Sequence, residues 1–318
     1  MKLVIGTRGS ALALWQAEYV KSRLLTLPGG PVSEVELQVI KTRGDKILDV
    51  TLSRVGGKGL FVKELEQALL DGDVDLAVHS LKDMPSELPE GLCLSAFTER
   101  ADPRDAWVLP EGAPQRGLAD LPPGTTVATA SLRRQAQILA ARPDLRVVPV
   151  RGNVGTRLAK LDRAEDGMEA LVLACAGLQR LGLASRISHA FEPHEMLPAV
   201  GQGALALECR EDDTRTGSLL AQLEHTETRH CVVAERALLR TLEGGCQVPI
   251  AAHAVMTDGR LHLEGLVASP DGAEVYRERS DGAPGDAERM GVAMAELLLE
   301  RGAGPILKAL ATEGSHGE

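Results

Sequence analysis

The chain has 318 residues, of which 44% are hydrophobic and 25% are charged, and its formal net charge is -10. This composition is typical of a soluble globular protein of two or three domains and argues against a disordered chain. No apolar run approaches the about 18 residues of a membrane helix, and the opening "MKLVIGT" has the pattern of a strand rather than of a signal peptide. We therefore expect a cytoplasmic protein that does not bind a membrane.

Three predicted strands are each followed by arginine and by the start of a predicted helix. The junctions are "KLVIG" with Arg8 and the helix cap Ser10, "TTVAT" with the cap Ser131, Arg133 and Arg134, and "RVVPV" with Arg151, the cap Asn153 and Arg157. Cations at a helix N-terminus oppose the helix dipole, but together with the free backbone N–H groups they suit an anion. Such junctions line the ligand crevice of an open α/β sheet, so the pattern predicts a polyanionic ligand.

Residues 125–163 contain eight basic and two acidic residues within an otherwise acidic chain. A solvated basic face is one explanation, and an anion-binding crevice is the other. Nucleic acid fits poorly, because only seven aromatic residues are available for stacking and the chain as a whole is acidic. The glycine-rich "VGGKGLF" matches neither a P-loop nor a dinucleotide fingerprint, so a nucleotide is not expected either.

The segment "DVDLAVHSLKDMP" predicts a strand over about 73–78 and places Lys82 and Asp83 at its end, facing the same crevice. Adjacent lysine and aspartate are often only a surface pair. In the crevice, however, Asp83 would be the one carboxylate among these junctions.

The five cysteines are scattered and include no CxxC pair, which argues against a disulfide framework or a structural metal site. Cys93, Cys175 and Cys209 lie in apolar, strand-like runs, and Cys231 lies on the apolar face of a predicted helix. Cys246 in "LEGGCQVPI" stands outside such a pattern, on a glycine-rich loop. It is either an incidental thiol or a reactive one.

The later chain predicts a different kind of module. A helix over "TRHCVVAERALLRTL" precedes three strands, "IAAHAVM", "RLHLEGLVAS" and "AEVYRERS", which are separated by tight Asp-Gly turns and followed by helices from about residue 285. This order predicts an α+β unit after a βαβ region.

Nine motifs together carry a resemblance to a known family. In chain order they are "TRGSALALWQA", "TRGD", "VGGKGLFVKELE", "AVHSLKDMP", "SLRRQ", "RGNVGTRL", "GLQRLG", "LPAVGQGA" and "LEGGCQVPI". In this order and spacing the chain resembles the porphobilinogen deaminases, also called hydroxymethylbilane synthases. The resemblance implies a transferase that deaminates four porphobilinogen molecules and joins them head to tail on a dipyrromethane primer, releasing a linear tetrapyrrole.

The resemblance also implies the fold and the cofactor. Two βαβ domains similar to periplasmic binding proteins would be followed by an α+β domain with a three-stranded antiparallel sheet. Domain 1 would comprise 1–99 and 200–219, domain 2 would comprise 100–199, and domain 3 would comprise 220–318. The dipyrromethane would be held by a thioether to Cys246, the partners would be porphobilinogen and the growing oligopyrrole, and the protein would be a monomer.

The resemblance further implies residue roles, beginning with Asp83 as the catalytic carboxylate. Cofactor-binding residues would be Cys246, Lys82, Asp83, Ser131, Arg133, Arg134, Arg151 and Gly152. Substrate-binding residues would be Arg8, Ser10, Arg151, Arg157, Arg180 and Gln202, and a mobile loop would carry Arg54, Lys58 and Phe61. Three positions depart from the family pattern: Arg54, where lysine is expected, Gly9, where glutamine is common, and Ala130, where serine is common.

Two other functions fit part of the sequence. A non-catalytic anion-binding protein would use the same two-domain fold without chemistry. A different transferase would use Cys246 as a nucleophile, but no histidine lies close to it in sequence to act as a base.

Overall fold

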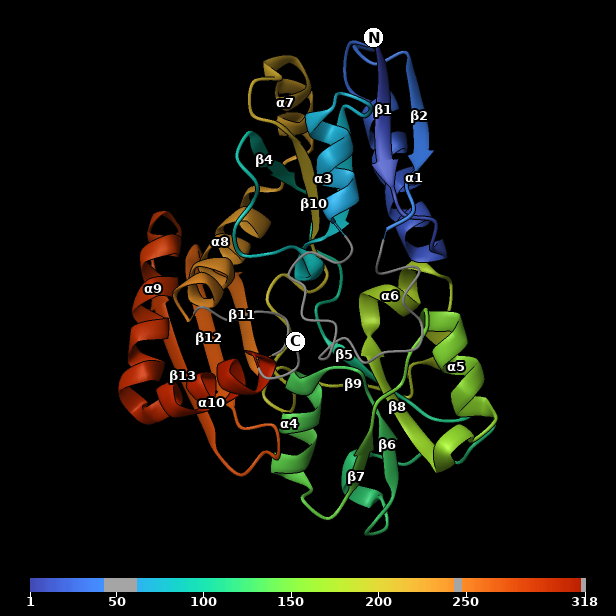
Figure 1. The fold of residues 1–318 in the computed structure, drawn as a ribbon, viewed down its shortest axis with the longest axis vertical. Helices are drawn as coiled ribbons and strands as arrows, with labels where there is room; N and C mark the ends of the chain where they lie inside the picture. The colour runs from blue at the N-terminus through green and yellow to red at the C-terminus, as the bar shows by residue number, and fades with distance from the viewer. Residues whose placement is uncertain (43–61, 243–247, 316–318) are drawn as a thin grey trace.

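The computed structural model describes residues 1–42, 62–242 and 248–315, and its strands form three separate sheets (Figure 1). The first sheet has the order β2-β1-β3-β10-β4. Its strands are β1 (Lys2–Thr7), β2 (Glu34–Val39), β3 (Leu76–Ser80), β4 (Leu92–Phe97) and β10 (Leu205–Arg210). β1 is parallel to both β2 and β3, whereas β10 runs antiparallel between β3 and β4.

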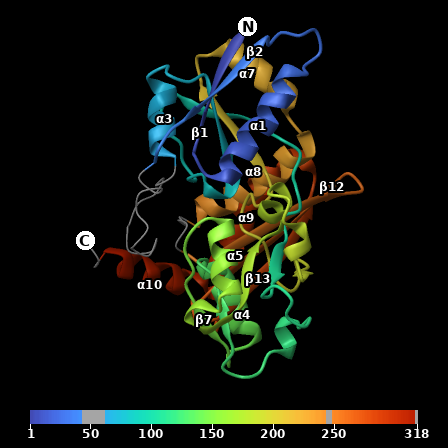
Figure 2. The same ribbon diagram turned by 90° about the vertical axis from the view of Figure 1, so that its right-hand side faces the viewer.

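Helices cover both faces of the first sheet, as Figure 2 shows for α1 and α3 on either side of β1. They are α1 (Ala11–Leu25), α3 (Lys63–Leu70) and α7 (Thr214–Leu220). Alternate residues of β1 point to opposite faces of the sheet. Leu3 and Ile5 pack in the core under α1, and Val4 packs toward α3. This alternation explains why the strand "KLVIG" is apolar without a break.

The second sheet has the order β7-β6-β8-β5-β9. Its strands are β5 (Asp105–Val108), β6 (Thr126–Ala128), β7 (Arg146–Val148), β8 (Met168–Ala174) and β9 (His189–Ala190). Its helices are α4 (Leu132–Ala141) on one face and α5 (Val154–Asp162) and α6 (Cys175–Arg180) on the other. The expectation that Cys175 belongs to a strand-like run is wrong, because β8 ends at Ala174 and Cys175 begins α6.

The chain passes between the first two sheets twice, after β4 and again before β10. The two crossings run side by side, since the Thr98 N–H donates to the Leu205 carbonyl at 3.2 Å and the Ala101 N–H donates to the Gly203 carbonyl at 3.2 Å. Gly203 has a φ of 90°, and a Cβ there would overlap the Ala101 carbonyl oxygen. The close approach of the crossings therefore requires glycine.

The third sheet is antiparallel, with β11 (Ile250–Thr257), β12 (Arg260–Ala268) and β13 (Val275–Gly282) in sequence order. Asp258 and Gly259 form the first turn with φ values of 51° and 73°, as a two-residue hairpin loop requires. The helices α8 (Thr226–Thr241), α9 (Ala287–Leu298) and α10 (Gly304–Ser315) accompany this sheet. The predicted fold class, two βαβ sheets and a C-terminal three-stranded antiparallel sheet, is confirmed.

The third sheet contacts the second one through α4. Ala136 of α4 packs with Ala251, Leu266 and Ala268 on the face of the sheet that α8 and α9 leave open. The turn after β12 also lies against α4, where the Gln135 Nε2 donates to the Pro270 carbonyl at 3.2 Å. Helix α4, which carries Arg133 and Arg134 in its first turn, thus lies between the second and third sheets.

Among the residues that the structure describes, no helix is both long and apolar enough to cross a membrane.

We predict that Gly272→Ala loosens the contact between the third sheet and α4. Gly272 has a φ of 71°, and a Cβ there would overlap the Ala140 backbone nitrogen and lie 2.8 Å from the Leu139 carbonyl carbon. Gly259→Ala is the matched control, because Gly259 has a φ of 73° but no described atom within 4 Å of its Cβ position. Both variants carry the strain of the left-handed backbone, about 1 kcal/mol. The overlap at Gly272 should add about 1–3 kcal/mol to the loss of unfolding free energy in urea, and equal losses would contradict the prediction.

Candidate active site

A cavity of about 100 Å³ lies at the junction of the first two sheets. Predicted site residues on its wall are Lys82, Arg134, Arg157, Arg180 and Gln202. Sequence reasoning missed the others, among them Leu12, Ser80, Val154 and Gly177, which are small or apolar and carry no chemical signal of their own. Residues from strand ends and helix starts of both sheets therefore line one cavity, while the predicted site residues Arg8, Ser10, Ser131, Arg133 and Arg151 are not on its wall.

The helix caps at these junctions are confirmed. Ser10 Oγ accepts from the Ala13 N–H at 3.3 Å, Ser131 Oγ accepts from the Arg134 N–H at 3.4 Å, and Asn153 Oδ1 accepts from the Thr156 N–H at 2.9 Å. A capping serine uses its oxygen as an acceptor and keeps its own O–H to donate. Ser10 and Ser131 can therefore fix a helix and still donate a hydrogen bond to an anion.

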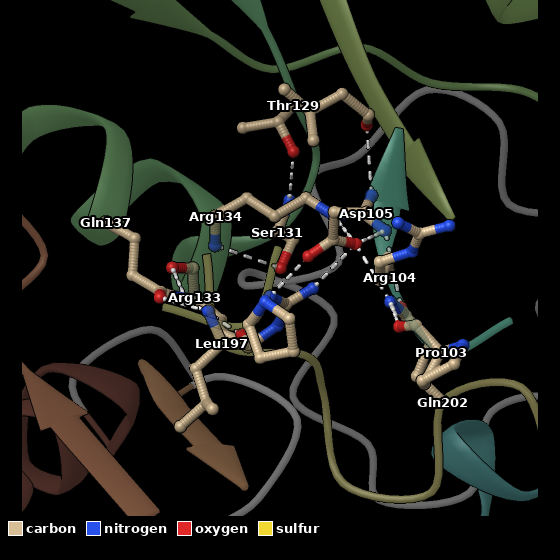
Figure 3. A network of polar contacts seen from close by, with 12 residues as sticks. Pro103, Arg104, Asp105, Thr129, Ser131, Arg133, Arg134, Gln137, Leu197 and Gln202 are labelled. Atoms are coloured by element: carbon tan, nitrogen blue, oxygen red, sulfur yellow. Dashed lines mark hydrogen bonds and ion pairs between the residues drawn. The ribbon is translucent and has the colours of Figure 1, made fainter. Parts of the chain in front are cut away.

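A buried carboxylate, Asp105, stands at the centre of the polar network in Figure 3. It is the first residue of β5, is 0% exposed, and accepts from Arg133 Nη1 at 2.7 Å, Arg134 Nε at 2.9 Å and Gln202 Nε2 at 2.9 Å. Burial alone would raise the pKa of Asp105, but the charges of Arg133 and Arg134 outweigh it and hold the pKa well below its usual range. The expectation that Asp83 is the one carboxylate among the junctions is wrong.

The two arginines of α4 differ in what else they contact. Arg133 Nη1 donates to the Leu197 carbonyl at 2.7 Å, and Arg133 is not on the cavity wall. Arg134 Nη1 donates to the Val172 carbonyl at 3.0 Å, and its side chain does reach the wall. Arg134 can therefore contact a ligand in the cavity directly. A direct contact between Arg133 and the ligand stays a prediction.

Lys82 and Asp83 lie in a short 3-10 helix, Leu81–Asp83, that follows β3 directly. Lys82 Nζ donates to Gln202 Oε1 at 3.4 Å. Burial lowers the pKa of Lys82 to about 8, the charge of Asp83 acts in the opposite direction, and that of Arg134 adds to the lowering. Asp83 itself is exposed, so an incoming ligand can reach its carboxylate.

Arg157 is held by the backbone of its own junction. Its Nε donates to the Gly152 carbonyl at 2.7 Å, and Gly152 has a φ of 109°. Burial lowers the pKa of Arg157 to about 10, the neighbouring Arg134 contributes to the lowering, and Asp83 opposes it. The charge of Asp83 is thus felt by Arg157 on the other side of the crevice, across the boundary between the two sheets.

Arg180 lies at the end of α6 and donates from Nη2 to the Gly203 carbonyl at 2.7 Å. Burial lowers its pKa to about 10. Within residues 1–42, 62–242 and 248–315, neither Arg157 nor Arg180 forms an ion pair with a carboxylate, and the same holds for Arg151 and Lys82. Among the described residues, the crevice thus holds several cations without an ion-pair partner, which suits a ligand with several anionic groups.

Four predicted site residues, Cys246, Arg54, Lys58 and Phe61, lie outside the described residues. Among those described, no group of three or more histidine, cysteine, aspartate or glutamate side chains could hold a metal ion. Arg8 is partly buried beside the Ser10 cap. The departures Gly9 and Ala130 both lie at exposed positions of the junctions.

Two family models match this chain and together span most of it. The model described as "Porphobilinogen deaminase, dipyromethane cofactor binding domain" matches residues 3–218, and the model described as "Porphobilinogen deaminase, C-terminal domain" matches residues 229–300. The chain belongs to the porphobilinogen deaminase family. A porphobilinogen deaminase from Syntrophotalea carbinolica is 55% identical over 308 residues, which cover 97% of this chain and 96% of that protein.

Solved structures with lower similarity include proteins from the bacterial periplasm. The periplasmic VFT2 domain of BvgS from Bordetella pertussis is 18% identical with a TM-score of 0.40, covering 70% of this chain and 86% of that one. The aliphatic sulphonate binding protein SsuA from Escherichia coli is 15% identical with a TM-score of 0.39, covering 76% and 70%. The fold assignment rests on the strand order above rather than on these similarities.

As a member of this family the chain is a transferase of tetrapyrrole biosynthesis. It deaminates four porphobilinogen molecules, joins them head to tail on a dipyrromethane primer and releases the linear tetrapyrrole hydroxymethylbilane. The alternative of a non-catalytic anion-binding protein is not favoured.

We predict that Asp105→Asn destabilises the protein by about 3–5 kcal/mol, because it leaves two buried guanidinium groups without their carboxylate. Asp144→Asn is the control, since the ion pair between Arg142 and Asp144 lies at the surface and its loss should change the free energy of unfolding far less. Urea denaturation of both variants at pH 7 measures the difference. Equal effects of the two substitutions would argue against the central role of Asp105.

The ion pairs of Asp105 should also make the free energy of unfolding depend on pH. Because the pKa of Asp105 is depressed by folding, its stabilisation is fully present above the unfolded value of about 4 and is lost as the pH falls toward the folded value. The stability gap between wild type and Asp105→Asn should therefore narrow below about pH 4. A constant gap from pH 7 to pH 3 would refute this.

Proposed function

We propose that Cys246 carries the dipyrromethane cofactor through a thioether. A thiolate is the reactive form of cysteine, and burial raises the pKa of Cys175, Cys209 and Cys231 to about 12 and that of Cys93 above its usual value. The four other cysteines are therefore poor nucleophiles, which supports Cys246 as the attachment point. The match to a cofactor-binding family model supports the presence of the cofactor.

The observation that carries the proposed site is the set of crevice cations that form no ion pair within residues 1–42, 62–242 and 248–315. Each pyrrole ring bears an acetate and a propionate, so the cofactor alone brings four carboxylates. Lys82, Arg157 and Arg180 line the cavity and would bind carboxylates of the cofactor or of the growing chain, and Arg134, whose charge Asp105 already balances, would contact them from the same wall. The binding surface would be completed by Arg8, Ser10, Ser131, Arg151, Gly152 and Gln202. Arg133 would also bind the cofactor. A mobile loop over the site would carry Arg54, Lys58 and Phe61.

Asp83 is proposed as the catalytic carboxylate. Loss of ammonia from porphobilinogen and each coupling step place positive charge on a pyrrole nitrogen, and a carboxylate near that nitrogen stabilises charge that arises only along the reaction path. When bound, the dipyrromethane would supply the pyrrole carbon to which the first unit is joined, and each later unit would be joined to the ring added before it. Asp83 is exposed at the end of β3, where substrate can reach it, and its charge acts on both Lys82 and Arg157.

The protein would be a cytoplasmic monomer whose ligands are porphobilinogen and the growing oligopyrrole. Domain 1 would comprise 1–99 and 200–219, domain 2 would comprise 100–199, and domain 3 would comprise 220–318. Binding between the first two domains would let the crevice widen as the oligopyrrole lengthens.

We predict that Cys246→Ala folds but lacks the cofactor. Its intact mass under denaturing conditions should equal the sequence mass, whereas the wild type should exceed the sequence mass by two pyrrole units. Cys93→Ala is the matched control and should keep the added mass, because Cys93 is only partly buried but has a raised pKa. Finding the dipyrrole on Cys246→Ala, or on a peptide of wild type that does not contain Cys246, would refute the attachment.

For Asp83→Asn we expect a loss of turnover of about 100-fold or more with the fold retained, because the amide keeps the size of the side chain but not its charge. Asp83→Glu should keep part of the activity. Glu87→Gln, which removes an exposed carboxylate four residues away, is the control and should leave turnover within two-fold. The measurement is single-turnover extension of the holoenzyme by mass spectrometry, and normal extension by the Asn variant would exclude Asp83 from the chemistry.

A further inference from the structure

Two of the seven aromatic residues of the chain lie together at the outer edge of the crevice. Trp15 and Tyr19 on α1 stack with nearly parallel rings, 5.6 Å apart between centroids and inclined by 4°. Trp15 is 38% exposed, whereas the other tryptophan, Trp107, is fully buried and donates a hydrogen bond to the Arg116 carbonyl. An exposed indole has one apolar face that a flat ligand ring could cover.

These rings lie where the first two sheets meet. α1 belongs to the first sheet and α6 to the second, and the two helices are in contact, with Leu12 Cδ2 3.9 Å from the position of a Cβ on Gly177 (Figure 1). Leu12 and Gly177 both line the cavity. Trp15 follows Leu12 by three residues, which places it on the same side of α1, one turn farther from the cavity.

Arg180 connects the cavity to the rings. Its guanidinium lies 5.7 Å from the centroid of the Trp15 ring, and its Nη2 is bound to the Gly203 carbonyl. Within the described part of the chain Arg180 forms no ion pair with a carboxylate, and its guanidinium is near the indole face, a backbone carbonyl and Tyr19. A flat indole beside such a cation is complementary to a flat ring that carries carboxylates.

The cavity of this structure is small compared with the product. Its volume is about 100 Å³, whereas the enzyme assembles four further rings on a two-ring primer. Even if the crevice widens, the growing chain has to extend past the present wall of the cavity. The stacked pair of Trp15 and Tyr19 is an aromatic surface that directly adjoins it.

We propose that Trp15, supported by Tyr19, is a stacking site for a pyrrole ring of the elongating chain, with a carboxylate of that ring bound by Arg180. This inference rests on the proposed placement of pyrrole carboxylates in the crevice. Pyrrole is an aromatic ring, so a stacked arrangement with the indole is favourable, and the contact is made only when the chain has grown out of the cavity. Trp15 thus holds the intermediate during the later additions and takes no part in the first one.

The first test follows chain length in the holoenzyme. After mixing with four equivalents of porphobilinogen, mass spectrometry should show that Trp15→Leu makes the first addition within two-fold of the wild-type rate but accumulates partly extended enzyme at least five-fold. Trp15→Phe keeps an aromatic ring and should stall much less. Leu25→Ala is the matched control, because Leu25 is 40% exposed at the far end of the same helix.

The second test measures how accessible Trp15 is to a fluorescence quencher. Trp107 is 0% exposed, so acrylamide quenching of wild-type fluorescence reports mainly on Trp15. Loading the holoenzyme with porphobilinogen should reduce the quenching constant at least two-fold, and Trp15→Leu should lose this change.

The outcomes separate the proposal from its alternatives. Equal slowing of all four additions in Trp15→Leu would mean that the contact between Trp15 and Arg180 only clamps the two helices, and it would overturn the proposal. Unchanged quenching on loading would overturn it as well. Because the first addition reports on the proposed active site independently, a normal first addition in Asp83→Asn would instead refute the placement of the active site.

Discussion

The burial of Asp105 between Arg133 and Arg134 is the interaction on which the organisation of this enzyme depends. Two adjacent arginines in the first turn of α4 oppose the helix dipole and are themselves almost fully buried, so without a carboxylate the arrangement would be strongly unfavourable. Asp105 provides that charge from the first residue of β5. One side chain thereby compensates two buried cations and fixes the start of the helix that carries them.

The same network joins segments that are far apart in the chain. Gln202, on the second crossing between the sheets, donates to both Asp105 and the Pro103 carbonyl of the first crossing, and its Oε1 accepts from Lys82. The third module is tied to these crossings by the ion pair between Arg100 and Glu235, at 2.6 Å, and by a hydrogen bond from the Gly201 N–H to Glu235 at 2.7 Å. One connected set of polar contacts therefore holds Lys82, the two crossings and the unit formed by the third sheet and its helices in position.

The crevice cations fall into two groups with different physical roles. Arg133 and Arg134 are neutralised inside the protein, and breaking their contacts would cost stability. Lys82, Arg157 and Arg180 are half-buried without an ion pair among the described residues, and partial burial lowers the pKa of each. A ligand rich in carboxylates relieves this unfavourable burial, so these three residues are suited to bind an intermediate whose charge grows with each added ring.

The local sequence determined much of the architecture, because the relevant signals act over a few residues. The caps Ser10, Ser131 and Asn153, the helices that they begin and the Asp258-Gly259 turn all follow from hydrogen bonds or backbone angles within one turn of chain. The ordered motifs also identified the family. The placement of Lys82, Arg134 and Arg157 on one cavity wall followed from the rule that strand ends meet at one edge of a sheet, whereas Arg180, the last residue of α6, was expected only from the resemblance.

Only the tertiary structure decided which charges are neutralised and which remain available. Asp105 looks in sequence like any acidic residue at the start of an apolar strand, and its role appears only when α4 and the second crossing close around it. The exposure of Trp15 beside Arg180 likewise depends on a contact between helices of different sheets, about 165 residues apart in the chain. Periodicity and capping report the neighbours of a residue along the chain, whereas the partner of a buried charge is set by packing between distant segments, and no local pattern encodes it.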